Sequence, residues 1–290
     1  MEAERRQVTV LFTDMVGFTT FSERAGEEAA FTLMQSLAKL MEDAVSEQGG
    51  VVHGFTGDGV MAVFGAPVAL EDAPLRACRA ALAIHERLKA ASGDLQAKHQ
   101  VRPQLRIGIN TGLAVVGRVQ GGASAGVTVL GDTVNVAARL QAMAEPEATV
   151  MSEAMHRLVQ GLVEASFGGD RQFKGKTEKQ KVYSLVSIRE GATRFGAAVG
   201  RGLSAYVGRE RELEILERGL AEARGQLQVI DIVAEPGMGK SRLLHEFRQR
   251  LDKERVFIVT GSCSPDGQQT PFLPFIEVVR GSFQVSAGED

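Results

Sequence analysis

Two aspartates lie at the ends of short apolar segments, at positions where the turns of a sheet are expected. Asp14 follows the apolar run 8–12, and Asp58 lies in the sequence TGDG at 56–59, between two further apolar runs. If the first strand pairs beside this predicted hairpin, the two carboxylates converge at one edge of a sheet. Paired carboxylates could there hold two divalent cations against a triphosphate. Taken alone, each segment favours the simpler interpretation of a turn aspartate that caps local N–H groups.

Other segments carry groups that suit a nucleotide. The stretch 15–19 contains Gly17 and could present successive backbone N–H groups to phosphate oxygens. Asn135 and Arg139 are four residues apart in a predicted helix, so they share one face. A neutral hydrogen-bonding group beside a guanidinium suits a ribose next to a phosphate, although a solvated helix face explains the same pair. The basic turn KGK at 174–176 is also typical of a solvated charge cluster.

A phosphate-binding loop is predicted at 234–241, where AEPGMGKS follows an apolar run and precedes a helical pattern. In this interpretation the backbone at Gly237 and Gly239 surrounds the phosphates. Lys240 reaches the β- and γ-phosphates, and Ser241 contacts Mg²⁺. The strict motif begins with Gly, where this chain has Ala234. No apolar run that ends in Asp follows the loop, so the Mg²⁺-holding carboxylate of such ATPases is missing and we expect no ATP hydrolysis here.

The elements that must position these residues mix strands and helices, which predicts an α+β domain with a mostly antiparallel sheet and flanking helices. Short apolar runs predict strands, and apolar residues at helical spacing predict helices. The predicted strands are 8–12, 51–55, 60–64, 105–110, 114–119, 127–130, 149–151 and 181–186, and the predicted helices are 27–47, 75–88, 132–143 and 153–159. We expect the fourth and fifth strands to be joined at Thr111-Gly112, and a loop that contains Gly17 to follow the first strand.

The chain divides into two predicted domains. The glycine-rich segment 187–205 predicts a linker between a domain over 1–186 and a second one over 206–290. In the second domain, helices at 210–224 and 240–251 alternate with strands at 228–233 and 256–260, as in a βαβ unit. A parallel sheet needs several strands covered on both faces. We therefore expect 206–290 to be the incomplete N-terminal part of an α/β P-loop domain.

The composition excludes several classes of protein. Lys and Arg together number 33 and Asp and Glu 36, so no basic excess indicates a nucleic-acid partner. No apolar run reaches about 18 residues, so we expect no membrane span. Two cysteines cannot form a disulfide framework, and they favour a cytoplasmic location. The five histidines lack metal-ligand spacing, so we expect no zinc site.

Taken together and in this order, the motifs FTDMVGFT, TGDGVMAVFG, RIGINTG and LGDTVNVAARL resemble the catalytic domain of class III nucleotide cyclases, the adenylyl and guanylyl cyclases. The resemblance covers about residues 5–186 and implies a ferredoxin-like α+β fold. The segment 206–213 and the P-loop resemble signalling ATPases of the AAA/STAND type. The order of cyclase, linker and ATPase is similar to that of soluble adenylyl cyclases and of bacterial cyclase-ATPase fusions.

This resemblance implies a role for each matching residue. Asp14 and Asp58 would bind two Mg²⁺ or Mn²⁺ ions per active site, assisted by the Met15 carbonyl. Asn135 would orient the ribose, and Arg139 would stabilise the charge that develops at the α-phosphate. The other substrate-binding residues implied are Gly17, Phe18, Thr19, Thr128 and Lys174.

The resemblance also implies a partner and a reaction. In this family the domain works as a head-to-tail homodimer, in which the aspartates of one protomer face the Asn and Arg of the other. A metal ion lowers the pKa of the ribose 3′-hydroxyl, whose oxygen attacks the α-phosphorus in line while pyrophosphate leaves. The implied partners are ATP and a second copy of this chain, and the implied product is 3′,5′-cyclic AMP.

Base recognition departs from the family pattern at one position. Adenylyl cyclases usually have Lys four residues before the second metal aspartate, where this chain has Gly54. The partner position is Thr128, as in the subgroup that includes bicarbonate-responsive cyclases, and the Glu and Cys of guanylyl cyclases are absent from both positions. Adenine is therefore favoured. His53 is adjacent to Gly54, and regular alternation would place it on the opposite face of the strand.

Three functions remain open at this point. The leading interpretation is an adenylyl cyclase that makes cyclic AMP from ATP. The second is a catalytically weak nucleotide-sensing or dimerisation module, motivated by Gly54, that regulates or is regulated by the P-loop region. The third is an ATPase switch that the cyclase-like domain regulates, and the missing acidic strand counts against it. The sequence identifies no regulatory partner.

Overall fold

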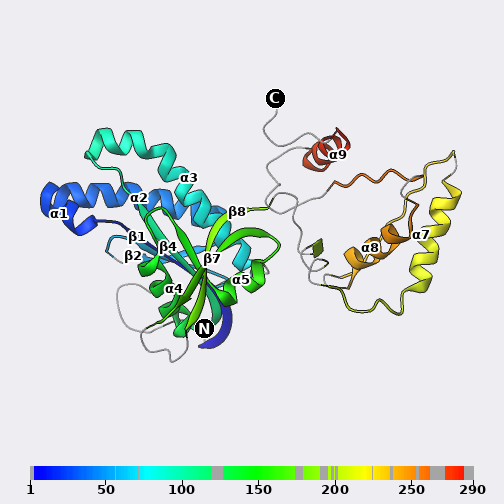
Figure 1. Ribbon diagram of the computed structural model, residues 1–290, viewed down its shortest axis with the longest axis horizontal. Helices are drawn as coiled ribbons and strands as arrows, with labels where there is room; N and C mark the ends of the chain where they lie inside the picture. Colours follow the sequence, from blue (N-terminus) through cyan, green and yellow to red (C-terminus); the bar gives the residue numbers. More distant parts are fainter. Residues whose placement is uncertain are drawn as a thin grey trace. The chain divides into compact units, whose positions relative to one another are not determined.

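The N-terminal part of the chain is built around an eight-stranded sheet, seen edge-on among its helices in Figure 1. The strands are β1 (Glu4–Met15), β2 (Val51–Phe55), β3 (Val60–Phe64), β4 (Leu105–Arg118), β5 (Val127–Leu130), β6 (Thr149–Ser152), β7 (Val163–Arg171) and β8 (Gln180–Ile188). Their order is β2-β3-β1-β4-β6-β8-β7, with β5 paired to β4. Only the β4–β6 pair is parallel among these ladders. The mostly antiparallel α+β fold predicted from the sequence is confirmed.

The computed structural model consists of two compact units, 1–202 and 203–290. It describes residues 3–55, 57–70, 72–118, 127–173, 179–189, 195–196, 199, 202–223, 225–235, 238–252, 255–261 and 272–283. Lys174 and Gly237, both predicted to bind phosphate, lie outside these residues. Within the described ranges, none of the helices combines the length and the apolar character needed to cross a bilayer.

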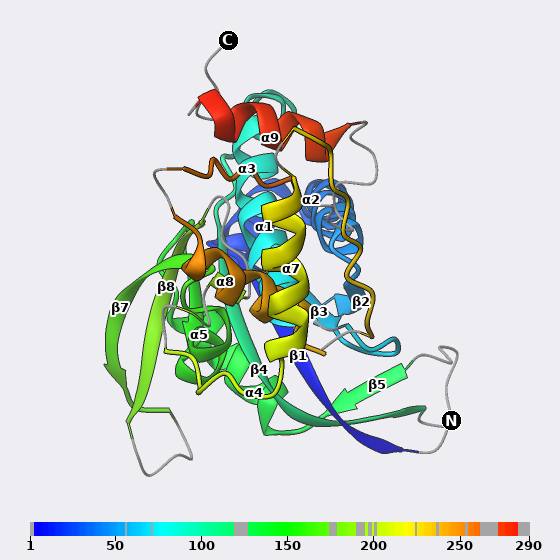
Figure 2. The same cartoon turned by 90° about the vertical axis from the view of Figure 1, so that its right-hand side faces the viewer.

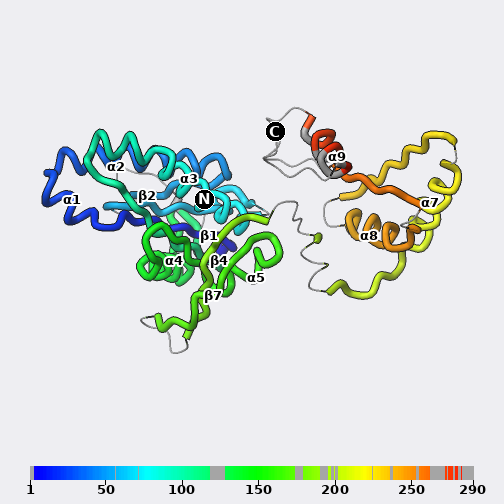
Figure 3. The backbone as a smooth tube through the Cα atoms, turned by 45° about the horizontal axis from the view of Figure 1, so that its top comes forward, coloured from blue at the N-terminus to red at the C-terminus, as the bar shows by residue number. Residues whose placement is uncertain are grey.

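Helices cover the two faces of the sheet unequally. They are α1 (Phe18–Ala25), α2 (Glu27–Glu47), α3 (Ala73–His99), α4 (Asp132–Met143) and α5 (Glu153–Val159). α2 and α3 run side by side over one face, as Figure 3 shows, and together with α1 and α5 they form the larger hydrophobic core. α4 packs against the opposite face in a smaller core. We call these the α2/α3 face and the α4 face.

Strict alternation along β1 assigns its residues to these two cores. Leu11 and Met15 contribute to the core of the α2/α3 face, whereas Val8 and Val10 contribute to that of the α4 face. Asp14 follows the same alternation and therefore belongs to the α4 face. The pairing of β1 with β3 and β4 on either side carries this division across the centre of the sheet.

β4 is one continuous strand, so the predicted strand pair around Thr111-Gly112 is wrong. Thr111 and Gly112 pair with Thr9 and Val8 of β1 without interruption. Gly112 serves close packing here, because a Cβ at this position would lie 2.7 Å from Oγ1 of Thr133 in α4. Gly112, which suggested a turn in the sequence, therefore allows α4 to pack closely on the strand.

Other elements differ from the predictions at their ends or were not foreseen. The loop predicted to contain Gly17 includes the helix α1, and the predicted helix 75–88 extends over 73–99. β7 was not predicted. Its apolar alternation is interrupted near Gly168 and Gly169, where the register with β8 shifts between Phe167 and Gly169. The helices predicted at 27–47, 132–143 and 153–159 are confirmed at both ends.

The second unit contains α7 (Glu210–Glu222), α8 (Lys240–Arg250) and α9 (Leu273–Phe283). α7 and α8 pack together through Leu213, Leu216 and Leu243. The strands predicted at 228–233 and 256–260 are wrong, because no ladder joins either segment to another in the part of this unit that the structure describes. A strand is defined by its main-chain partners, and an apolar run without a partner stays unpaired.

A buried asparagine anchors the start of α4 to the sheet. Asn110 lies on β4 and is 6% exposed. Its Nδ2 donates to the Thr133 carbonyl of α4 at 3.0 Å, and its Oδ1 accepts from Ser152 Oγ at 2.6 Å. Ser152 in turn caps α5 by accepting from the Met155 N–H. One side chain therefore joins β4 to the start of two helices.

We expect Asn110→Ala to lower the free energy of unfolding by about 1–3 kcal/mol, because it removes two buried hydrogen bonds. Urea denaturation followed by circular dichroism measures this change. The matched control is Asn135→Ala, which removes an exposed amide from α4 itself. An equal loss of stability in both variants would contradict the anchoring role of Asn110.

Candidate active site

Asp14 and Asp58 lie together at one end of the sheet. Asp14 is near the end of β1, and Asp58 is in the turn that enters β3, the neighbour of β1. The Met15 N–H donates to the Asp58 carbonyl at 3.1 Å, which holds the turn against the end of β1. The sequence predicted that the two carboxylates converge if the first strand pairs with the hairpin, and β1 does pair with β3.

The two carboxyl groups interact directly. Burial raises the pKa of the Asp58 carboxyl, and a hydrogen bond to Asp14 and the charge of Asp14 raise it further. Arg106 of β4 opposes this rise and forms an ion pair with Asp14. Asp14 and Arg106 are directly paired across the β1–β4 ladder. Two sources of positive charge thus stabilise the pair: a proton on Asp58, which the raised pKa favours, and the guanidinium of Arg106 beside Asp14.

The donor set fits a hard divalent cation. Mg²⁺ and Mn²⁺ prefer carboxylate and carbonyl oxygens, and Asp14 and Asp58 supply two carboxylates beside the Met15 backbone. Among the described residues, no group of three or more His, Cys, Asp or Glu side chains could hold a metal ion. A cation at this pair would therefore need further oxygen ligands from beyond the side chains of this cluster.

A tight turn and a helix start follow directly. Gly17 has φ +72°, a left-handed conformation that favours glycine, and it precedes the first residue of α1. The Val16 N–H donates to the Gln104 carbonyl at 2.8 Å, which fixes the turn to the segment before β4. The first N–H groups of a helix lack intrahelical acceptors. Phe18 and Thr19 are the first two residues of α1, so their N–H groups have no intrahelical acceptor.

Asn135 and Arg139 belong to a different part of the surface. The sheet-facing side of α4 consists of buried residues, namely Thr133, Val136, Ala137 and Leu140. Asn135 and Arg139 lie on the other side of α4, and Asn135 is exposed. Among the described residues, no hydrogen bond or ion pair joins either of them to Asp14 or Asp58. One copy of the chain thus carries two separate sets of candidate residues.

The comparisons with known proteins identify both parts of the chain. The family model described as "Adenylate and Guanylate cyclase catalytic domain" matches residues 1–187, more than half of the chain. The chain belongs to this cyclase family. A second family model, described as "AAA ATPase domain", matches residues 205–289.

Relatives and solved structures agree with this assignment of the cyclase domain. Adenylate cyclase 1 of Rhizobium meliloti is 35% identical over 188 residues, which cover 64% of this chain and 28% of that protein. An uncharacterised protein of the same organism is 32% identical over 289 residues, 99% of this chain and 28% of that protein. The chain thus spans just over a quarter of the length of these two curated relatives.

Two crystal structures show the same fold. The adenylyl cyclase CyaB of P. aeruginosa has a TM-score of 0.63 and 27% identity, covering 67% of this chain and all of that one. The guanylyl cyclase Cya2 has a TM-score of 0.62 and 26% identity, covering 66% of this chain and 97% of that one. The cyclase domain is therefore similar to enzymes of both base specificities.

A bulge lies in β2 next to Gly54, the position at which the family resemblance implies base recognition. β2 pairs with β3 through Val52 with Ala62 and Gly54 with Met61, so His53 is an extra residue in β2. The regular alternation that predicted His53 opposite to Gly54 is therefore broken, and both residues oppose Met61. Thr128 lies in β5, half-buried and paired with Gly117 of β4.

Sequence reasoning missed two contributors to the aspartate pair of the cyclase domain, Arg106 and Thr13, and expected another neighbour for Gly59. Arg106 begins the RIGINTG motif, but only the β1–β4 register places it beside Asp14. Gly59 packs against β1 so closely that a Cβ would lie 1.9 Å from the Thr13 carbonyl oxygen. The glycines of TGDG indicated a hairpin and a close approach of the backbone to phosphate or metal, whereas the observed neighbour of Gly59 is the backbone of β1.

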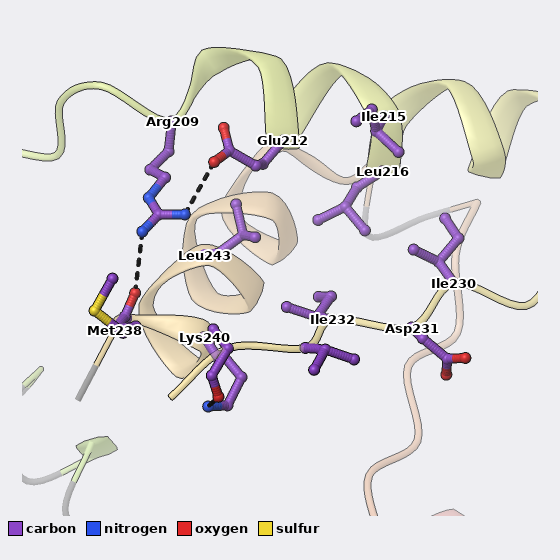
Figure 4. Close-up of a pocket in the computed structure, with 13 residues that line it drawn as sticks. Arg209, Glu212, Ile215, Leu216, Ile230, Asp231, Ile232, Met238, Lys240 and Leu243 are labelled. Carbon is purple, nitrogen blue, oxygen red and sulfur yellow. Dashed lines mark hydrogen bonds and ion pairs between the residues drawn. The ribbon is translucent and has the colours of Figure 1, made fainter. Parts of the chain in front are cut away.

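The P-loop region lines a cavity of about 280 Å³ in the second unit (Figure 4). Gly239, with φ +82°, begins α8, and Ser241 lies in the first turn of α8. Lys240 Nζ donates to the carbonyl oxygens of Ala234 and Glu235, the latter at 3.0 Å. The Arg209 guanidinium donates to the Glu212 carboxylate at 2.9 Å and to the Met238 carbonyl at 3.3 Å. The lysine therefore contacts its own loop, and its contact with a phosphate stays a prediction.

We expect Gly59→Ala to destabilise the cyclase domain, because the added methyl group would overlap the Thr13 carbonyl. The matched control is Gly54→Ala, since a Cβ at Gly54 meets no atom within 4 Å. Thermal unfolding should show a lower midpoint for the first variant and an unchanged one for the second. Similar midpoints for both variants would contradict the close approach at Gly59.

The raised pKa of Asp58 predicts a pH dependence of stability without metal. The folded protein holds a proton at Asp58 to higher pH than the unfolded chain does, so stability is lost as pH rises through that range. We expect Asp58→Asn in EDTA to weaken the fall in melting temperature as pH rises above the ordinary pKa of an aspartate. The control is Asp94→Asn, at an exposed carboxylate on α3. A profile for Asp58→Asn parallel to that of the unsubstituted protein would refute this coupling.

Proposed function

We propose that the cyclase domain is an adenylyl cyclase that converts ATP into 3′,5′-cyclic AMP and pyrophosphate. The observation that carries the proposal is the adjacent pair of Asp14 and Asp58 at one end of β1, with Asn135 and Arg139 on a separate helix face. The similarity to Adenylate cyclase 1 of Rhizobium meliloti supports the same activity. Adenine is favoured because Gly54 and Thr128 stand where guanylyl cyclases carry Glu and Cys.

The active site would form between two copies arranged head to tail. Asn135 and Arg139 face away from the sheet that carries the aspartates, so a second chain must bring the two sets together. An apolar patch of three exposed side chains, Leu113, Val115 and Leu130, lies on one face of the β4–β5 ribbon. Figure 2 shows this ribbon running out past the helices beside the start of β1. Such a patch favours burial against a partner, and a second copy is the partner we propose.

Asp14, Asp58 and the Met15 carbonyl would hold two Mg²⁺ or Mn²⁺ ions together with oxygens of the triphosphate. When bound, such ions lower the pKa of the ribose 3′-hydroxyl and neutralise charge on the triphosphate. Arg106, which pairs with Asp14 in this structure, would be released by the added positive charge and could then bind a phosphate oxygen.

The other residues would position the substrate. The N–H groups at Gly17, Phe18 and Thr19 would bind phosphate oxygens at the start of α1, where the helix dipole favours negative charge. Lys174 would contact the triphosphate. This arrangement would hold the ribose oxygen in line with the α-phosphorus, which is the main requirement of phosphoryl transfer.

The partner chain would complete the site with three side chains. Asn135 would orient the ribose by hydrogen bonds, and Thr128 would contact the adenine. Arg139 would stabilise the charge that develops on the α-phosphate as pyrophosphate leaves. The absence of a side chain at Gly54 would leave the adenine fewer contacts than in relatives that carry Lys there.

We expect Asp58→Ala and Arg139→Ala each to reduce cyclic AMP production at least about a hundredfold, because each removes charge stabilisation from every site of a homodimer. Equal mixing of the two variants with subunit exchange should restore roughly a quarter of the unsubstituted activity. Half of the random dimers are then mixed, and each mixed dimer has one intact site. Failure of the mixture to recover activity would contradict the shared site.

Product analysis separates this proposal from its alternative. Purified protein with Mn²⁺ and either ATP or GTP should yield cyclic AMP from ATP in excess over cyclic GMP from GTP. Binding of ATP with no cyclic product would instead favour a catalytically weak nucleotide-sensing or dimerisation module. A larger yield of cyclic GMP would overturn the assignment of adenine.

A further inference from the structure

Thr13 is a buried residue next to the aspartate pair that the proposed reaction does not use. It is 1% exposed and lies on β1 directly before Asp14. By the alternation of β1 it belongs to the α2/α3 face, opposite to Asp14. Its hydroxyl donates to Met41 Sδ of α2 at 3.1 Å and accepts from the Val60 N–H at 2.8 Å. Both hydrogen-bonding functions of this hydroxyl are therefore engaged, on the face away from the carboxylates.

The bond to Val60 takes the place of a missing backbone contact. The β1–β3 ladder ends at the pair of Phe12 and Met61. The next N–H along β3, that of Val60, is bonded to the Thr13 side chain instead. Val60 is 1% exposed, so its N–H has no access to water, and without this acceptor it would be buried and unsatisfied. The Thr13 hydroxyl thus fixes the point at which β3 begins.

Fixing this point also fixes Asp58, which lies two residues before Val60. The segment 58–60 is held at three places: Asp58 by the Met15 N–H, Gly59 against the Thr13 carbonyl, and Val60 by the Thr13 hydroxyl. Asp14 lies between the two residues of β1 that make these contacts. A shift at Val60 would therefore change the separation of the two carboxylates.

We infer that Thr13 is a positioning residue that sets the separation of the Asp14 and Asp58 carboxylates and so sets the affinity of the site for divalent cations. The inference rests on the proposed function, in which these carboxylates hold the cations. The Met41 sulfur has a supporting part: by accepting the hydroxyl hydrogen it leaves the oxygen lone pairs directed at the Val60 N–H.

The test compares Thr13→Val, which keeps the shape and removes the hydroxyl, with Thr13→Ser, which keeps the hydroxyl. The matched control is Thr9→Val. Thr9 is buried on the same strand and the same face, but its Oγ1 bonds Thr111 at 3.2 Å, away from the segment 58–60. Two Mn²⁺ midpoints are measured on the full chain. The first is the Mn²⁺ concentration that gives half of the maximal rise in melting temperature, in the absence of ATP. The second is the Mn²⁺ concentration that gives half-maximal cyclic AMP production.

We expect Thr13→Val to raise both Mn²⁺ midpoints roughly tenfold, because a shift at Val60 changes the separation of the two carboxylates and groups that orient metal ligands have effects of this size. Thr13→Ser and Thr9→Val should stay within about twofold of the unsubstituted protein, because the Val60 N–H keeps its partner in both. Without metal, Thr13→Val should lose more melting temperature than Thr9→Val, because only Thr13→Val leaves a buried N–H unpaired. Each Mn²⁺ midpoint is therefore measured from the variant's own metal-free melting temperature, which separates positioning from stability.

Unchanged Mn²⁺ midpoints in Thr13→Val would overturn the inference and leave Thr13 a purely structural residue. If Thr13→Val does not fold, Met41→Leu carries the test: freeing the hydroxyl to rotate should raise the Mn²⁺ midpoint roughly two- to threefold, and no change overturns the inference. Absence of cyclic AMP from the unsubstituted protein, with the thermal Mn²⁺ midpoint still shifted by Thr13→Val, would refute the proposed function alone.

Discussion

The continuous pairing of β1 with β4 is the contact on which the rest of the cyclase domain depends. It runs from Glu4 with Val116 to Met15 with Leu105, the whole length of β1. At one end it sets Asp14 beside Arg106. Further along, Gly108 lets α4 lie on the sheet, since a Cβ there would be 2.1 Å from the Gln141 nitrogen. A single ladder thus positions both the aspartate end of the sheet and the helix that carries Asn135 and Arg139.

The same ladder also keeps these two sets of residues apart. α4 uses its apolar side to cover β4, so its polar side must face outward. The aspartates are meanwhile held at the end of β1 by contacts from β3 and β4. Although Asp14 belongs to the α4 face, Asn135 and Arg139 lie on the side of α4 that faces away from the sheet, so one chain does not bring them to the aspartates. Catalysis in the proposed reaction therefore depends on a second chain, and the exposed apolar patch on the β4–β5 ribbon offers a surface for one.

Charge at the aspartate pair links stability to the proposed activity. The pKa of Asp58 is raised first by burial and then by the adjacent Asp14, so ionisation of both carboxylates is unfavourable. Arg106 relieves part of this repulsion. The Thr13 hydroxyl and the close packing of Gly59 nevertheless hold the two segments together. The fold thus holds the two carboxylates together although their contact is unfavourable without metal. A bound cation would stabilise this arrangement.

The sequence by itself determined the local elements and the family. Helical spacing gave the exact bounds of α2, α4 and α5, and the joint motifs pointed to the cyclase family that the comparisons show. Periodicity reports which residues are buried, and this information is local. The prediction failed at Gly112, because a glycine can indicate either a turn or close packing within a strand. It also failed at 228–233, because a strand forms only where another strand pairs with it.

Tertiary structure alone decided which distant residues meet. Asp14 and Arg106 are 92 residues apart, and Thr13 and Val60 are 47 apart. Their contacts follow from strand register, and no single segment contains that information. The bulge at His53 is of the same kind, because it exists only relative to β3. Residue types thus specified the chemistry available to this protein, whereas the pairing of strands decided which of those groups act together.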